Sequence, residues 1–226
     1  DTFSIASSFD LRQIATDDFQ FEAGRPVTGI HWWGSFNGWT ESYLPAVLPL
    51  AFHVGIWTDV PNSNPGNPAS FGHPGTLIWE SYCTQWAWAL AGYQETAAGS
   101  TLGETCFQFS YLLSQDEWFQ PAVEETEKET VPAFYWITIA TIYDPVDSPA
   151  EHVWGWITRS HQFGETAALV REITPGSWPP SAGVEWLAGA PAASDSGIPW
   201  DMAFQLTTYG AANETEKVRT DATDIT

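Results

Sequence analysis

Two cysteines, Cys83 and Cys106, are the residues whose number and placement suggest a definite chemistry. An even cysteine count without metal-type spacing is typical of a disulfide in an oxidising compartment. Each cysteine lies in an apolar run, 76–88 or 103–113, and these runs are expected to form consecutive strands. If the two strands pair as a hairpin, the cysteines face each other. The sequence therefore predicts a Cys83–Cys106 disulfide, which would contribute about 3 kcal/mol in the chain-entropy model.

A second group of residues is suited to binding sugars. His31 and Trp33 alternate along one expected strand, and His53 and Trp57 along another. These four side chains would share one face if their strands pair in the right register, and aromatic faces stack well on sugar rings. The alternative is that the tryptophans fill the core. The pattern thus indicates a glycan platform without excluding a packing role.

A third group carries oxygen ligands. Asp144, Asp147 and Glu151 fall within one turn region, and calcium takes six to eight such oxygens. Their spacing does not match that of an EF-hand loop, and solvated turn residues are the alternative. Calcium is the only cofactor that these residues suggest, since the five histidines show no zinc spacing.

Catalytic motifs are missing from the sequence. It contains no Gly-x-Ser-x-Gly elbow, no His-Glu-x-x-His and no phosphate-binding loop. A glycosidase needs two carboxylates facing one cleft, and sequence alone does not show whether the acidic residues near the strands form such a pair. We therefore expect a protein that is not an enzyme.

One modification site is suggested near the end of the chain. Asn213 begins an Asn-x-Thr triplet, which is the acceptor sequence for N-linked glycans. Such a triplet also arises by chance, and a bacterial host need not use it.

Composition restricts the classes of binding partner and the cellular location that we expect for this protein. Acidic residues number 28 and basic residues only 7, so the net charge is −21. Nucleic acid and anionic lipid would be repelled. No apolar run reaches the roughly 18 residues needed to span a membrane. Together with a first residue, Asp1, that is not Met, these features predict a secreted protein, extracellular or at the cell surface.

The apolar pattern is that of an all-β protein. Apolar residues alternate with period 2, as in strands with one buried face, while 134–142 is apolar on both faces and should be a central strand. Turns rich in Pro and Gly separate the runs. We expect a jelly-roll-like β-sandwich of about ten antiparallel strands with one disulfide. The expected strands cover 17–22, 26–35, 50–58, 76–88, 103–113, 132–143, 152–160, 168–173, 184–187 and 200–208.

Three regions follow from this pattern. An N-terminal arm or exchanged strand is expected over 1–16, the sandwich over 17–209, and a polar tail over 210–226. The arm carries four large apolar side chains, Phe3, Ile5, Phe9 and Leu11, that a neighbouring copy could bury. The alternative is that the arm forms the first strand of its own sheet.

Several short motifs resemble an uncharacterised family of secreted bacterial, planctomycete-like β-sandwich domains. The motifs are Asp17-Asp18-Phe19, Pro26 to Gly34, Phe71 to Gly75, Leu77 to Glu80, Tyr135-Trp136-Ile137 and Asp201 to Leu206. The resemblance covers about residues 15–208 and implies an extracellular address and a sandwich fold. It implies no activity, so no catalytic residue is carried over.

These observations favour a non-catalytic extracellular structural protein, the subunit of a filament, tube or surface layer formed by copies of the same chain. A secreted carbohydrate-binding module is the alternative. Polymer symmetry, the glycan and the source organism do not follow from the sequence.

Overall fold

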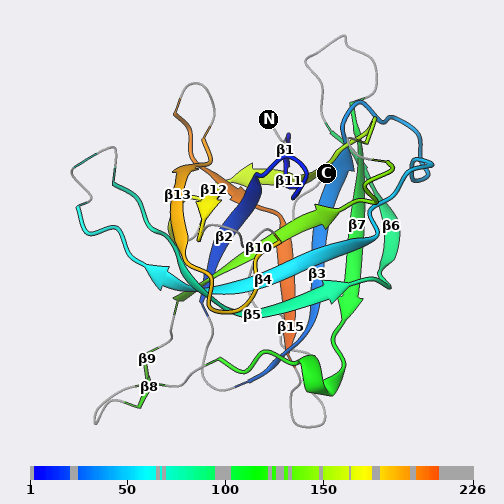
Figure 1. Cartoon of the computed structure of the whole chain (residues 1–226). Coiled ribbons are helices and arrows are strands. Elements are labelled where there is room, and N and C mark those ends of the chain that lie inside the picture. The colour runs from blue at the N-terminus through cyan, green and yellow to red at the C-terminus, as the bar shows by residue number, and fades with distance from the viewer. Residues whose placement is uncertain are drawn as a thin grey trace.

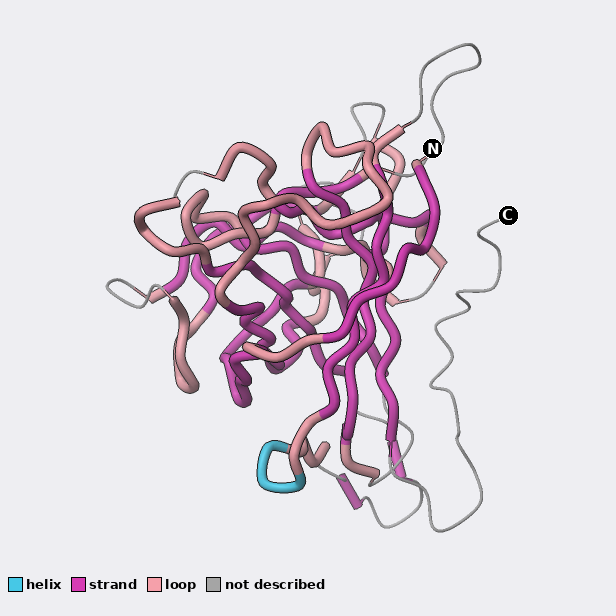
Figure 2. The backbone as a smooth tube through the Cα atoms, turned by 90° about the vertical axis from the view of Figure 1, so that its right-hand side faces the viewer, coloured by secondary structure: helices cyan, strands magenta, loops and turns pink. Residues whose placement is uncertain are grey.

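The computed structural model describes residues 3–20, 25–64, 67, 70–94, 103–121, 124–125, 130–131, 134–147, 150–162, 164–174, 179–193 and 197–208. These residues form two antiparallel sheets that face each other, together with a two-stranded ribbon and one 3-10 turn. Strands β4, β5 and β10 cross in front of β3, β7 and β15 at a steep angle (Figure 1), and Figure 2 shows the layers from the side. The expected all-β fold with facing antiparallel sheets is confirmed.

The first sheet, sheet A, has seven strands in the order β1-β11-β3-β7-β6, with β14 paired to β11 and β15 paired to β3. Its long central strand β3 runs between β7 on one side and β11 and β15 on the other. The strands are β1 (Ser4–Ala6), β3 (Val27–Phe36), β6 (Ala87–Tyr93), β7 (Thr105–Leu112), β11 (Trp154–Ser160), β14 (Trp200–Met202) and β15 (Phe204–Thr208).

The second sheet, sheet B, has six strands in the order β13-β12-β2-β10-β4-β5. Its strands are β2 (Ile14–Gln20), β4 (Ala51–Val60), β5 (His73–Cys83), β10 (Phe134–Ile142), β12 (Ala168–Ile173) and β13 (Trp186–Pro191). The remaining elements are the ribbon β8 (Glu124–Glu125) and β9 (Thr130–Val131) and the 3-10 turn Gln115–Glu117. The expected central strand is confirmed, because β10 lies between β2 and β4 and its residues 135–141 are buried.

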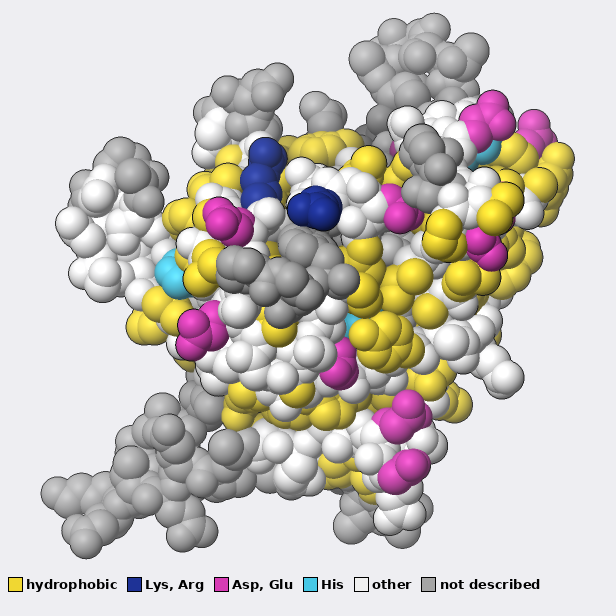
Figure 3. All heavy atoms as spheres, in the orientation of Figure 1, with side chains coloured by type: hydrophobic (Ala, Val, Ile, Leu, Met, Phe, Trp, Pro, Cys, Tyr) yellow, Lys and Arg dark blue, Asp and Glu magenta, His cyan; other side chains and the backbone are white. Residues whose placement is uncertain are grey.

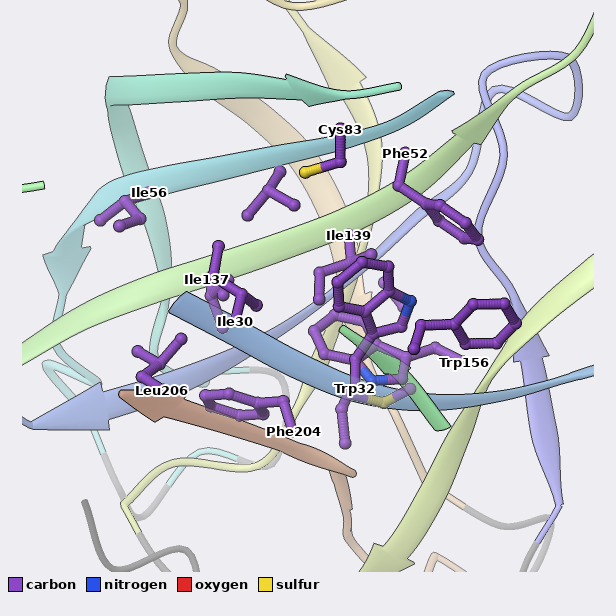
Figure 4. Packing of buried hydrophobic residues seen from close by; sticks show 14 of the residues in the cluster. Ile30, Trp32, Phe52, Ile56, Cys83, Ile137, Ile139, Trp156, Phe204 and Leu206 are labelled. Atoms are coloured by element: carbon purple, nitrogen blue, oxygen red, sulfur yellow. The ribbon is translucent and has the colours of Figure 1, made fainter. Parts of the chain in front are cut away.

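The main hydrophobic cluster lies between the two sheets. Alternate residues of each strand point into it, as a pleated strand requires. Trp32 of β3, Phe52 of β4 and Phe109 of β7 are fully buried there and contact one another through their rings. Figure 4 shows side chains from both sheets meeting in this layer. Much of the tryptophan and phenylalanine of the chain is therefore packed between the two sheets.

A second hydrophobic cluster lies on the other face of sheet B. Trp57 of β4, Leu77 of β5 and Trp136 of β10 are fully buried in it. Sheet B curls around this cluster until its two edges meet, where Leu77 donates its N–H to Val184 and accepts one from Gly183. Both faces of sheet B are therefore covered, which is why its strands carry apolar residues on both sides.

The predicted disulfide is wrong, and so is the strand count of about ten. Sheets A and B contain thirteen strands, and both cysteines are free thiols. The expected strand 76–88 is in fact two strands, β5 in sheet B and β6 in sheet A. The hairpin partner of β7 is therefore β6 rather than β5.

The cysteines also point to different places. Cys83 belongs to the cluster between the sheets (Figure 4). Cys106 pairs with Ser35 and directly precedes Phe107, which points into this cluster, so Cys106 faces the opposite side of sheet A. Burial raises the pKa of both thiols, to about 12 for Cys106.

The N-terminal segment packs on its own chain. Its residues 4–6 pair with β11 as the outer strand of sheet A, and the ring of Phe3 meets Trp200 edge-on at 4.9 Å. Phe9 contacts His53, while Leu11 is exposed. In the single chain, the N-terminal segment thus forms the first strand of its own sheet, which was the alternative to an exchanged arm. Exchange of this segment between copies stays a prediction. Among the described residues no helix is long and apolar enough to cross a membrane.

Candidate functional site

The four residues of the predicted glycan platform do not share one face. His31 and Trp33 lie on β3 in sheet A, whereas His53 and Trp57 lie on β4 in sheet B. His53 and Trp57 are also fully buried, so neither can stack on a sugar. The platform of four is therefore wrong, because its two strands belong to different sheets.

His31 and Trp33 nevertheless lie on an accessible surface. Residues 30, 32 and 36 of β3 point into the core, so the intervening side chains face outward. Trp33 is directly opposite Gln108 on β7. His31 lies between Ser110 on β7 and Gln205 on β15. We call these five side chains, His31, Trp33, Gln108, Ser110 and Gln205, the Trp33 face.

The Trp33 face holds hydrogen-bonding groups that the described part of the chain does not use. His31 Nδ1 and Ser110 Oγ are bonded at 2.8 Å. The side chains of Trp33, Gln108 and Gln205 have no hydrogen-bond or ring partner among the described residues, and Trp33 packs on neither hydrophobic cluster. Burial lowers the pKa of His31, so all five side chains are uncharged at neutral pH. This is a neutral, partly aromatic surface with free donors and acceptors.

The neighbouring strand β6 places only small side chains beside the Trp33 face. Ala87 and Ala89 lie beside Ser110 and Gln108 in the same rows. Two residues beyond Trp33, Ser35 pairs with Cys106 and Gly155. These flanking side chains are small, and Trp33 is partly exposed beside them.

A second notable feature is the edge of sheet A formed by β6. This strand pairs with β7, and no other strand pairs with it among the described residues. Its seven residues, Ala-Trp-Ala-Leu-Ala-Gly-Tyr, include no charge and no proline. The large side chains Trp88, Leu90 and Tyr93 are 43%, 45% and 40% exposed. Hydrophobic side chains gather at the right-hand margin of Figure 3, where Figure 1 places β6.

Three other sheet edges carry features that discourage pairing. The outer strand β1 has only three residues. Strand β5 is tied to residues 183–185 over part of its length and carries Glu80. Strand β13 has two register irregularities and ends in Pro191. Short, charged, bulged or proline-containing edges resist the addition of another strand, so β6 is more open to pairing than these three edges.

The residues predicted to bind calcium do not form a site. Asp147 and Glu151 are exposed, and Asp144 uses Oδ1 to accept the N–H of Val146 within its own turn. In the described ranges no group of three or more His, Cys, Asp or Glu side chains is placed to hold a metal ion. The predicted glycosylation site Asn213 lies outside the described residues.

Three buried carboxyl groups, which the sequence reasoning did not connect, meet where β2 approaches β14. Asp17 accepts the N–H of Met202, and Asp18 accepts that of Glu165. Asp201 contacts His161 Nδ1 at 2.6 Å. Burial, with smaller contributions from neighbouring carboxyls, raises the pKa of Asp17 and brings that of Asp18 to about 7.

The position of these carboxyls gives them a structural role. Asp17 belongs to sheet B and its partner Met202 to sheet A, so their bond joins the two layers. Asp18 and Asp201 together hold the loop between β11 and β12 through backbone N–H groups. The carboxyl cluster therefore links the two sheets and the β11–β12 loop at one corner of the sandwich.

Comparison with known proteins gives one result. A protein-family model described as a domain of unknown function (DUF7901) matches residues 2–207. The chain belongs to the DUF7901 family. No curated protein and no solved structure matches it. The match starts at residue 2, so the N-terminal segment is part of the family domain, although the motif resemblance placed its start near residue 15.

Sequence reasoning found two of the five residues of the Trp33 face in this DUF7901 domain and missed both the other three and the open edge at β6. Gln108 and Gln205 are unremarkable in sequence, and only the register of β3 with β7 and β15 brings them to Trp33. The open edge was hidden because β6 was merged with β5. A signal was present in the residues between the two strands, Thr84-Gln85-Trp86, which interrupt the alternating pattern.

Proposed function

We propose that this DUF7901 domain is a non-catalytic extracellular structural protein whose copies assemble through the open edge of β6. The observation that carries the proposal is an uncharged edge strand with exposed Trp88, Leu90 and Tyr93 in a chain of net charge −21. Natural sheets usually protect such an edge, and unprotected edges pair with other chains.

Charge supports a second copy as the partner. Two copies with net charge −21 repel each other over most approaches. Strand β6 contains no acidic residue, so pairing there brings backbone groups and apolar side chains together with less repulsion than contact between acidic surfaces. Main-chain hydrogen bonds would supply affinity, as in other cases of strand addition.

The N-terminal segment offers a second route to assembly. If residues 1–16 were exchanged between copies, residues 4–6 would make the same pairing with β11 of a neighbour. Such exchange gives a head-to-tail contact, which yields an open filament when the rotation does not close. Pairing at β6 and exchange of this segment are compatible, because they use opposite sides of sheet A.

Two finer points belong to the same proposal. Successive strands pass repeatedly between the two sheets, as from β2 to β3 and from β3 to β4, which supports a jelly-roll-like arrangement. The motif resemblance to secreted bacterial sandwich domains supports an extracellular or cell-surface address.

The test is the Leu90→Lys variant. A lysine at the centre of β6 should block pairing, because edge lysines are a common protection against it. Light scattering after gel filtration, over a range of concentrations, and electron microscopy should show assemblies of the native chain and monomers of the variant. Leu187→Lys is the matched control, since Leu187 is also a strand leucine, 46% exposed, but lies on β13.

Either of two outcomes would overturn the proposal. A native chain that stays monomeric at all concentrations is not an assembly subunit. Assembly of Leu90→Lys to the same size as the native chain would remove β6 from the interface.

A further inference from the structure

The Trp33 face has a composition that neither folding nor assembly at β6 explains. Trp33 contributes to neither hydrophobic cluster. The face lies on the outer side of sheet A, whereas the large exposed side chains of β6 pair with core-facing residues of β7. It therefore needs an explanation of its own.

We propose that the Trp33 face binds a neutral polysaccharide. The partly exposed indole of Trp33 offers an apolar surface to the C–H face of a sugar ring, as amphipathic aromatic side chains do. The amides of Gln108 and Gln205 each provide donors and an acceptor for hydroxyl groups. These three side chains have no other partner among the described residues.

The register sets the arrangement of these groups. Gln108 is the direct cross-strand neighbour of Trp33, and such neighbours have Cβ atoms about 5 Å apart. Gln205 is beside His31 on the opposite strand. A ligand lying across β7, β3 and β15 would therefore meet an amide on each side of the indole.

His31 contributes an uncharged hydrogen-bonding side chain to the Trp33 face. Its Nδ1 is bonded to Ser110 Oγ, and burial lowers the pKa of the ring. Because Nδ1 of the uncharged imidazole is already bonded, the other ring nitrogen remains to form a hydrogen bond with a hydroxyl group of the ligand. The face thus presents hydrogen-bonding groups without charge.

Other classes of ligand fit this face poorly. A polyanion would be repelled by the net charge of −21, and a metal ion would find no carboxylate among the five side chains. A purely apolar partner would bury the amides of Gln108 and Gln205 without hydrogen bonds, which is unfavourable. A neutral, hydroxyl-rich polysaccharide can pack its sugar rings on the indole and form hydrogen bonds with the amides.

The test uses native gels containing soluble neutral polysaccharides, namely hydroxyethylcellulose, glucomannan and dextran, with alginate as a charged comparison. At least one neutral polysaccharide should retard the native chain, and Trp33→Ala should weaken this binding by about tenfold or more. Tyr43→Ala is the control, because Tyr43 is an exposed aromatic residue in the loop after β3 and should leave binding unchanged.

A second variant covers the case in which Trp33→Ala does not fold. Gln108→Ala combined with Gln205→Ala removes both amides and should also reduce retardation. All measurements are repeated in the Leu90→Lys background, so loss of assembly and loss of binding are separate results.

The proposal is overturned if no neutral polysaccharide retards the native chain. It is equally overturned if only alginate does so, or if variants of the Trp33 face that keep the native melting temperature bind as well as the native chain.

Discussion

At the scale of single residues, environment decides what each side chain can do. Asp17 and Asp18 are neighbours in sequence, but β2 points Asp17 between the sheets and Asp18 toward the second cluster. Asp18 Oδ1 is buried without a hydrogen-bond partner in the described structure. A carboxyl group in such surroundings holds its proton more tightly than in water.

This raised pKa predicts how stability depends on pH. The folded chain keeps a proton on Asp18 up to about pH 7, whereas the unfolded chain releases it near pH 4. The folded state therefore binds more protons between these values, and the contribution of Asp18 to stability falls as pH rises through this window. Asp18→Asn should raise the free energy of unfolding at pH 8, relative to the native chain, by about 1 to 3 kcal/mol.

Denaturant unfolding of both proteins at pH 8 and pH 4.5 checks this prediction. The stabilisation by Asp18→Asn should be larger at pH 8. Burial lowers the pKa of His31, which opposes the trend below about pH 6.5, but His31 is present in both proteins and cancels in the comparison. An equal effect of the substitution at both pH values would contradict the raised pKa.

At the scale of strands, alternation of apolar residues was enough to place most elements. The expected strand 50–58 is β4, and its alternating residues Phe52, Val54 and Ile56 are fully buried. The error at 76–88 arose because apolar residues continue while the chain leaves one sheet and enters the other. Local periodicity reports which residues are buried, but it does not report the sheet to which a strand belongs.

The curling of sheet B could not be predicted for the same reason. Ile14, Trp136 and Val184 are far apart in sequence and meet only because the two edges of the sheet come together. An apolar pattern on both faces of 134–142 indicated that something covers each face. It did not indicate that sheet B covers one of them itself.

Truncation of Trp136 tests this second cluster. The side chain is fully buried, and its Nε1 donates to Asp59 Oδ1 at 2.8 Å. Trp136→Ala should lower the free energy of unfolding by about 3 to 5 kcal/mol, because it leaves a cavity and an unpaired acceptor. Chemical denaturation provides the measurement, and a loss below about 1 kcal/mol would mean that the cluster is not a packed core.

At the scale of the whole molecule, charge and edges act together. Few basic side chains appear on the face shown in Figure 3, and the net charge of −21 keeps copies apart. The net charge follows from the composition, but only the sheet order shows that the uncharged strand β6 lies at an edge. Two copies of this acidic molecule should therefore approach with less repulsion at this neutral edge than at acidic parts of the surface.

Amide hydrogen exchange at β6 tests the central claim most directly. The outward backbone groups of Ala87–Tyr93 pair with no other strand in the described part of the chain, so their amides should exchange quickly at low concentration. If copies pair at this edge, protection of the peptide containing β6 should rise with protein concentration in the native chain and stay low in Leu90→Lys. Exchange at β6 that is independent of concentration in the native chain would contradict assembly through this strand.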